Sequence, residues 1–178
     1  MSPPIDPAER PDAGPHDADD ARWMREALRS AREAEAADEV PIGAVVVLDG
    51  VCIGRGGNRT RAAADPTGNA EMHALREAAR HVGAQRLVGA TVYTTVEPCF
   101  MCAGALLHAR VDRVVWGVRD PKFGACASLG AVLSDPRLNH QVAITEGVCA
   151  DEARTLLVEF FQSKRRAAAE GRTERPGS

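Results

Sequence analysis

The fold of this chain is decided by two short stretches, Asp65-Pro66-Thr67-Gly68-Asn69-Ala70-Glu71-Met72-His73-Ala74-Leu75 and Glu97-Pro98-Cys99-Phe100-Met101-Cys102. In each, a polar or proline-containing segment leads into a stretch with helical spacing. The first predicted helix carries the carboxylate Glu71 in its first turn, and the second opens with a Pro-Cys-x-x-Cys pattern.

The two cysteines at the start of the second helix are candidate metal ligands. Thiol groups three residues apart on a first helical turn lie on one side of it, and a helix N-terminus favours the thiolate form. Proline suits the position before them because the first turn of a helix has no partner for an N–H. A C-x-x-C pair alone is also compatible with redox chemistry or with two buried thiols, but the acidic motif upstream favours zinc at Cys99 and Cys102.

Glu71 is the candidate catalytic residue. A water activated by zinc needs a nearby carboxylate to take its proton and to hand that proton to the substrate and leaving group. Taken by itself, Glu71 is only a first-turn acid favoured by the helix dipole. Together with the cysteine motif it predicts a proton shuttle.

Composition points to one globular domain in a reducing compartment. The chain has 178 residues, 44% of them hydrophobic and 26% charged, which is close to the average for soluble domains. We found no apolar run long enough to cross a bilayer and no secretory signal, and five cysteines is an odd number that argues against a disulfide framework. We therefore predict a cytoplasmic protein without membrane contact.

Both ends of the chain differ in charge from its centre. Residues 1–19 are rich in Asp and Pro, so we expect a disordered acidic segment there. The folded domain is predicted over residues 20–166, and residues 167–178 are predicted to be a disordered tail that follows a basic cluster.

The pattern of elements predicts a three-layer α/β/α domain with a mixed five-stranded sheet. The Asp49-Gly50 pair predicts a tight hairpin between the first two strands. The expected helices cover residues 20–37, 70–82, 99–110, 128–133 and 151–163, and the expected strands cover residues 42–48, 51–54, 91–95, 113–118 and 142–145.

From about Trp23 to Arg166 the chain resembles the bacterial tRNA-specific adenosine deaminases of the cytidine deaminase superfamily. The shared motifs are Pro41-Ile42-Gly43-Ala44-Val45, Gly57-Asn58-Arg59, the two stretches quoted above, Asp120-Pro121-Lys122-Phe123-Gly124-Ala125-Cys126, Asn139-His140 and Glu159-Phe160-Phe161. The resemblance implies a cytidine-deaminase-like fold and a homodimer that deaminates the wobble adenosine of a tRNA anticodon to inosine.

The resemblance also implies a role for individual residues. One zinc ion per chain would be held by Cys99, Cys102 and the residue at position 69, with Glu71 moving protons. Asn58 matches a residue that binds the flipped base, and Asp120 matches one that holds the ribose. The basic residues that would suit phosphate contacts of an anticodon stem-loop are Arg59, Arg61, Arg110, Arg119 and Lys122.

Asn69 departs from the family pattern, which has a histidine at this position. A neutral amide is a poor zinc ligand, so we expect zinc binding and activity to be weakened or lost. Three explanations are open. The histidine was replaced by engineering to silence the enzyme, or the chain is a natural member of the family with weakened or absent catalysis, or another residue takes the place of the missing ligand. His73 is the nearest substitute, but it lies about one helical turn further along and is not expected to reach the metal. His108 and His140 are expected to be structural or to face RNA.

Two other functions stay open at the level of sequence. One is a deaminase that acts on a free nucleobase or nucleoside such as guanine or cytosine. The other is a non-catalytic protein that binds the anticodon loop without turnover.

Overall fold

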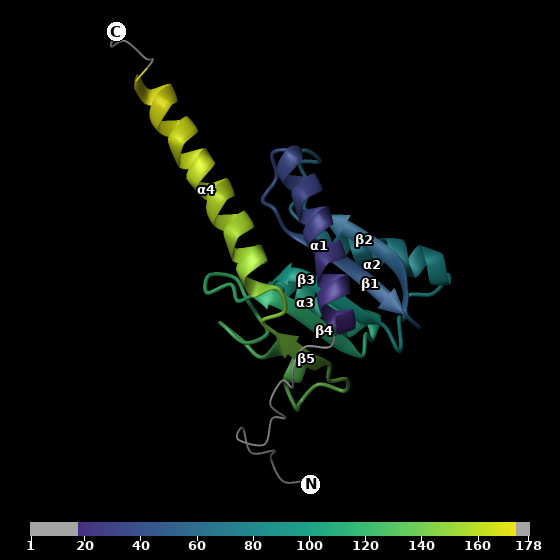
Figure 1. The fold of residues 1–178 in the computed structure, drawn as a ribbon. Helices are drawn as coiled ribbons and strands as arrows, with labels where there is room; N and C mark the ends of the chain where they lie inside the picture. Colours follow the sequence, from purple (N-terminus) through teal and green to yellow (C-terminus); the bar gives the residue numbers. More distant parts are fainter. Residues whose placement is uncertain (1–17, 174–178) are drawn as a thin grey trace.

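The computed structural model describes residues 18–173, and within them the predicted α/β/α sandwich is confirmed (Figure 1). The elements are α1 Ala18–Ala36, β1 Gly43–Leu48, β2 Val51–Gly57, α2 Ala70–Val82, β3 Thr91–Val96, α3 Phe100–Ala109, β4 Arg113–Val118, the 3-10 helix η2 Val132–Ser134, β5 Ala143–Glu146 and α4 Ala150–Thr173. None of the helices in this part of the chain is both long and apolar enough to span a membrane.

The sheet is mixed and has five strands in the order β2-β1-β3-β4-β5. Strand β1 runs antiparallel to both β2 and β3, whereas β3, β4 and β5 are parallel. The β1–β2 hairpin turns at Asp49 and Gly50, which both have positive φ angles (50° and 73°), as the Asp-Gly pair predicts.

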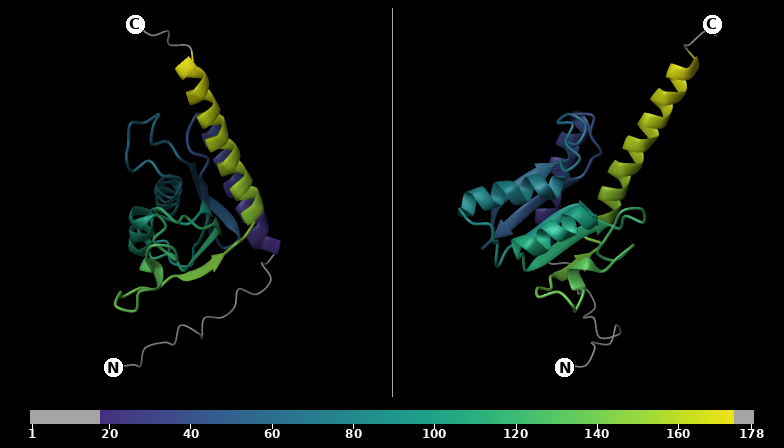
Figure 2. Two further views of the ribbon diagram at one scale, coloured as in Figure 1. Left: turned by 90° about the vertical axis from the view of Figure 1, so that its left-hand side faces the viewer. Right: turned by 180° about the vertical axis from the view of Figure 1, so that it is seen from behind.

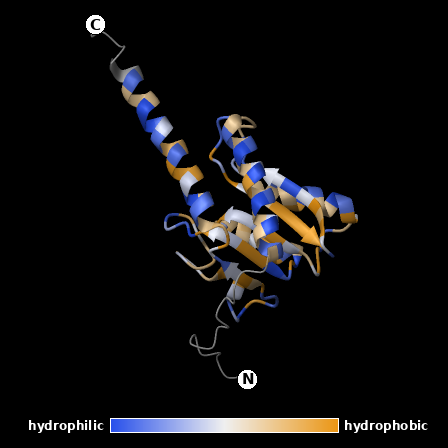
Figure 3. Ribbon diagram, in the orientation of Figure 1, coloured by the Kyte–Doolittle hydropathy of each residue, from blue (hydrophilic) through white to orange (hydrophobic). Residues whose placement is uncertain are grey.

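The helices cover the two faces of the sheet in pairs. Helices α2 and α3 pack on one face, and α1 and α4 pack on the other, as the side view shows (Figure 2, left). Neighbouring residues of one strand therefore enter different cores: Val46 faces α2 and α3, and Val45 faces α1. Strand β1, which is covered on both faces, is accordingly apolar along its length, whereas α1 and α4 alternate apolar and polar residues (Figure 3).

Helix α2 lies very close to strand β2 because small residues meet at the contact. A Cβ atom at Gly54 would lie only 2.7 Å from the backbone nitrogen of Ala78. The matching residues on α2 are Ala70, Ala74 and Ala78, all with no exposed surface. This contact fixes the start of α2, and with it residues 69–71, relative to the sheet.

Two predictions about elements near the C-terminal end were wrong. A helix over residues 128–133 does not form. The N–H groups of Leu129 and Val132 instead bond to Gly124 and Ala125, and only the short η2 follows. Helix α4 continues to Thr173, through residues that we assigned to a disordered tail, because the Ala167–Ala169 run has high helix propensity. The rest of that tail and almost all of the acidic segment 1–19 lie outside the described residues.

Helix α4 extends well past the domain and is its most protruding element (Figures 1 and 2). An ion pair between Lys164 and Asp38 links it to the segment that follows α1. Lys164 also lies over the ring of Phe160, with 5.3 Å between the ammonium nitrogen and the ring centroid.

Candidate functional site

The two stretches that decide the fold meet at the N-termini of α2 and α3. Asn69 is the N-cap residue of α2, and Cys99 is the N-cap residue of α3. Neither side chain caps its own helix; the amide nitrogen Nδ2 of Asn69 instead lies 3.7 Å from Cys99 Sγ. The tertiary fold therefore brings position 69 and the cysteine motif together, as predicted.

Glu71 is buried beside the cysteines. Its side chain is in the first turn of α2, and only 3% of the residue is exposed. Burial raises the pKa of Glu71 to about 7, and the nearby Cys99 thiolate acts in the same direction. A carboxyl group with a pKa near neutrality can both accept and donate a proton at physiological pH.

The two cysteines have different environments. The hydrogen bond from the Cys102 thiol and those from the Cys102 and Met101 amides lower the pKa of Cys99 to about 6, against the opposing effect of burial. Cys102 is fully buried, and its pKa is raised well above the ordinary value because its proton is held by Cys99 and its surroundings are apolar.

The side chains at this point fit zinc only in part. Cys99 and Cys102 are suitable ligands, but a catalytic zinc site normally has three protein ligands that are cysteine, histidine or carboxylate. Within residues 18–173, no three such side chains are grouped closely enough to hold a metal ion. The side chain at position 69 lies close to Cys99, but it is a neutral amide, which is a poor zinc ligand.

The histidines do not complete the set. Among the described residues, His73 is not grouped with the two cysteines, and its buried Nε2 atom has no hydrogen-bond partner there. His140 lies in the segment between η2 and β5, with Nε2 2.8 Å from the carbonyl oxygen of Val111 in the loop before β4. His108 is on α3 and lines a surface groove described below.

Asn58 and Asp120 lie next to the site and also have structural contacts. The carboxamide oxygen of the buried Asn58 accepts a hydrogen bond from the Ala70 N–H at 2.9 Å, which satisfies the first turn of α2. Asp120 Oδ1 accepts hydrogen bonds from the N–H groups of Lys122 and Phe123. A backbone bridge between Cys99 and Gly124 places the Asp120 loop against the cysteine motif.

Two of the candidate phosphate-binding arginines have acidic partners within the chain. Arg119 makes a two-point contact with Glu146, with both distances 2.7 Å, and Arg61 binds Asp38. Arg110 lies at the end of α3 and approaches the backbone oxygen of Asn139.

Sequence reasoning missed two buried glutamates that hold loops around the site. Glu39 has no exposed surface, and its carboxylate accepts hydrogen bonds from the N–H groups of Arg61 and Ala62 and from the Thr60 hydroxyl. Glu97 binds the Asp120 loop in the same way. The only signal in the sequence was a glutamate one or two positions before a proline, in Glu39-Val40-Pro41 and in Glu97-Pro98.

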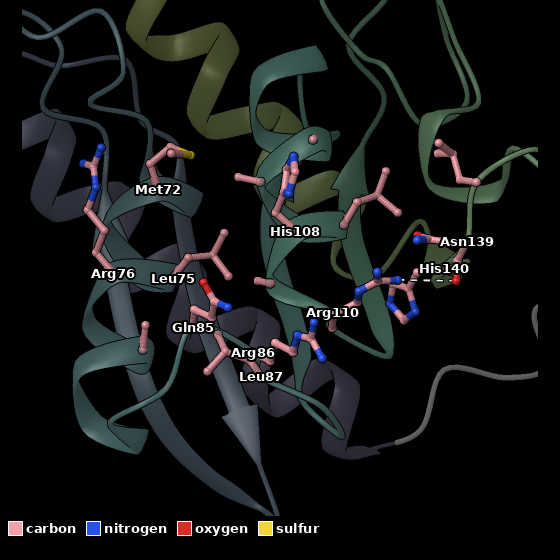
Figure 4. A pocket seen from close by; sticks show the side chains of 16 residues that line it. Met72, Leu75, Arg76, Gln85, Arg86, Leu87, His108, Arg110, Asn139 and His140 are labelled. Carbon is pink, nitrogen blue, oxygen red and sulfur yellow. Dashed lines mark hydrogen bonds between the residues drawn. The ribbon is translucent and has the colours of Figure 1, made fainter.

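A groove of about 750 Å³ runs along the outer surface of α2 and α3 (Figure 4). Its apolar lining includes Met72 and Leu75 from α2, and Ala105 and Leu107 from α3. The lining starts at Met72 on α2 and at Gly104 on α3, so the groove lies along the later turns of the two helices whose first turns carry the site.

Comparison with known proteins agrees with this geometry. The family model of the MafB19-like deaminases matches residues 18–165. The tRNA-specific adenosine deaminase of Haemophilus influenzae is 45% identical over 82% of this chain and 85% of that protein. The enzyme of the same name from Agrobacterium fabrum is also 45% identical, over 83% of this chain and 97% of its own length.

Solved structures show the same relationship. One from a study of A-to-I editing by tRNA:A34 deaminases at the wobble position of transfer RNA superimposes with a TM-score of 0.74 and 45% identity, covering 76% of this chain and 99% of that one. A guanine deaminase from Bacillus subtilis has a TM-score of 0.53 and 37% identity, over 55% of this chain and 63% of that one. By sequence, fold and the convergence of Glu71 with the two cysteines, this chain belongs to the family of tRNA-specific adenosine deaminases.

Proposed function

We propose that this chain has the scaffold of an enzyme that hydrolyses the wobble adenosine of a tRNA anticodon to inosine. The observation that carries the proposal is Glu71, a buried carboxyl group with a pKa near 7 beside Cys99 and Cys102. The 41–45% identity to tRNA-specific adenosine deaminases over most of the chain supports the substrate class.

In the proposed reaction Glu71 carries the proton. Its carboxylate removes one proton from the attacking water and delivers it to the ring nitrogen beside the reacting carbon. It then takes the remaining proton of the added hydroxyl group and gives it to the amino group, which departs as ammonia while the carbonyl forms. A carboxyl group whose pKa is close to the working pH serves in both directions. Asn58 would contact the flipped base through its Nδ2 group, since its oxygen is bonded to Ala70, and Asp120 would hold the ribose.

Cys99, Cys102 and position 69 form the proposed zinc site, and a zinc ion there would supply Lewis acidity to the attacking water. With an asparagine as the third residue, we propose that the chain binds zinc weakly and turns over slowly or not at all. Because RNA binding does not depend on the third zinc ligand, we expect the chain still to bind the anticodon stem-loop. The five free cysteines support a location in the reducing cytoplasm.

The substrate test compares an anticodon stem-loop with free bases. The assay uses the Asn69→His variant with added zinc. We expect it to form inosine in a stem-loop with adenosine at the wobble position and not to deaminate free guanine, cytosine or adenosine. The similarity to a guanine deaminase is what makes the comparison necessary. Deamination of free guanine without any inosine in the stem-loop would favour a nucleobase deaminase. If both the Asn69 chain and the Asn69→His variant bound the stem-loop and neither formed inosine, the non-catalytic RNA-binding protein would be favoured.

We propose further that the chain forms a homodimer through the α2–α3 groove. Helix α3 is apolar nearly all round, yet one side of it faces solvent in the single chain. An interface here would place the second copy close to the N-termini that carry the site, so that both copies could contact one anticodon loop.

Ala105→Arg is expected to convert the dimer to a monomer, because a charged side chain would enter the apolar floor of the groove. Analytical ultracentrifugation at micromolar concentration measures the change, and circular dichroism confirms that the monomer is folded. Val51→Arg, at an exposed position on β2, is the matched control and should leave the dimer intact. A dimer that survives Ala105→Arg would show that the interface lies elsewhere.

A further inference from the structure

The carboxylate of Glu97 lies at the centre of the loop that borders the site. The residue directly follows β3, and only 3% of it is exposed. Its Oε1 atom accepts hydrogen bonds from the N–H groups of Cys126, Ala127 and Ser128, at 3.0, 2.6 and 2.9 Å. Its Oε2 atom accepts one from the Asp120 N–H at 3.0 Å and one from the Ser128 hydroxyl.

All five donors belong to residues 120–128, so this single side chain binds both ends of the loop. Three successive amides converge on Oε1, an arrangement in which backbone dipoles favour a negative charge. If the carboxylate were lost, the buried Cys126 amide and the four partly buried donors would lose their partner, which is costly inside a protein.

The loop is also packed directly against the carboxylate. A Cβ atom at Gly124 would overlap Glu97 and would lie 2.6 Å from the Asp120 carbonyl oxygen, so a larger residue has no room there. On the other side of the loop, Ala125 donates its N–H to the carbonyl oxygen of Pro98 at 2.9 Å. Glu97 and Pro98 thus join the loop to the segment that leads into Cys99.

We propose that Glu97 is a positioning residue: it sets the place of the 120–128 loop, and through the Asp120 N–H the place of the Asp120 carboxylate, relative to the cysteine motif. Glu97 itself does not touch the substrate. The inference rests on the proposed function, because the role of Asp120 in holding the ribose is part of that function.

The substitution Glu97→Gln is expected to break the contact at one end of the loop and to keep the contacts at the other end. A glutamine can keep its oxygen toward the three amides of residues 126–128 and can donate its amide to the Ser128 hydroxyl. It then presents an N–H to the Asp120 N–H, so that this one contact is lost. The expected result is a loop that stays attached at residues 126–128 and is released at Asp120.

The first measurement is amide hydrogen exchange by NMR on the full chain without RNA. In Glu97→Gln the Asp120 amide should exchange about tenfold faster, while amides in the central strands β1 and β3 are unchanged. Glu39→Gln is the matched control, because it changes an equally buried carboxylate that holds a different loop. Its glutamine oxygen can keep the Arg61 and Ala62 amides and its NH2 group can donate to the Thr60 hydroxyl, so the exchange of the Asp120 amide should be unchanged.

The second measurement is the Kd of the full chain for two anticodon stem-loops, one with adenosine and one with 2′-deoxyadenosine at the wobble position. If Glu97 acts through Asp120, Glu97→Gln should reduce the preference for the ribose form about threefold or more, whereas Glu39→Gln should leave that ratio unchanged. A merely structural role would weaken both RNAs equally.

Several outcomes would overturn the inference: an unchanged Asp120 amide in Glu97→Gln, an unchanged ribose preference despite faster exchange, or a wild-type chain that binds both RNAs equally well. A wild-type chain that bound no stem-loop would contradict the proposed function instead, and the exchange measurement would still report on the anchor. If Glu97→Gln does not fold, Ser128→Ala removes one of the five contacts and should change both quantities in the same direction, by less.

Discussion

Asn69→His is expected to give a chain that holds close to one zinc ion and that converts wobble adenosine to inosine, at least about a hundredfold faster than the asparagine form. The physical reason is the placement of residue 69. The N-cap position of α2 directs its side chain toward Cys99, and an imidazole there would add the third ligand that the cysteine pair lacks.

The chain with Asn69 is expected to hold markedly less than one zinc, or to lose it to a mild chelator. Zinc is measured by elemental analysis after dialysis, and inosine by sequencing of an arginine tRNA anticodon stem-loop. Asn69→Ala is the control: it removes the amide without adding a ligand and should behave like the original chain. Tightly bound zinc at one per chain with Asn69 present would contradict the expected impairment. If the zinc-loaded Asn69→His protein formed no inosine, the proposed tRNA adenosine deaminase activity would be ruled out.

Glu71→Gln, made in the Asn69→His chain, is expected to lower kcat by about a thousandfold or more while zinc content stays the same. Glutamine has nearly the same shape and cannot move a proton, and Glu71 is not one of the proposed metal ligands. Single-turnover assays with the stem-loop measure the rate, and elemental analysis measures the metal. A variant that kept more than a tenth of the activity would show that another group shuttles the proton.

The same substitution should change the pH dependence of stability of the chelator-treated chain. Burial raises the pKa of Glu71 from 4.5 to about 7, so the folded state keeps this proton between those two pH values while the unfolded state releases it. The free energy of unfolding therefore falls as pH rises from about 4.5 to 7. Above pH 7 the buried charge destabilises the fold by up to about 3 kcal/mol.

Glu71→Gln should remove that slope and be the more stable protein at pH 8, with no difference at pH 4. Urea unfolding followed by tryptophan fluorescence at the two pH values gives the comparison. Equal stability of the two proteins at pH 8 would mean that the carboxylate is not desolvated in the folded chain.

Much of the fold follows from short-range rules. The bounds of α2 and β4 match the prediction at both ends, and the Asp49-Gly50 hairpin has the expected φ angles. These elements are specified by the period of their apolar residues and by turn chemistry, which act over a few residues and can be read directly.

The wrong prediction of a helix over residues 128–133 involves contacts between distant residues. Residues 128–133 have a helical pattern. However, the N–H groups of residues 126–128 donate hydrogen bonds to Glu97, which lies about thirty residues earlier in the chain. The amides of Leu129 and Val132 then turn back to Gly124 and Ala125. Local helix propensity does not include such distant hydrogen bonds. The five hydrogen bonds to a buried carboxylate stabilise the loop more than one turn of helix would.

The family, the α/β/α order of elements and the chemical groups of the site could all be predicted from the order of the amino acids; these groups are Glu71, Cys99, Cys102 and the asparagine where a histidine is expected. How these groups act depends on the folded chain. Burial beside the cysteines moves the pKa of Glu71 toward neutrality, and the convergence of two helix N-termini puts Asn69 against Cys99. Glu97 and Glu39 became recognisable as loop anchors only there, because burial and hydrogen-bond partners are properties of the folded chain.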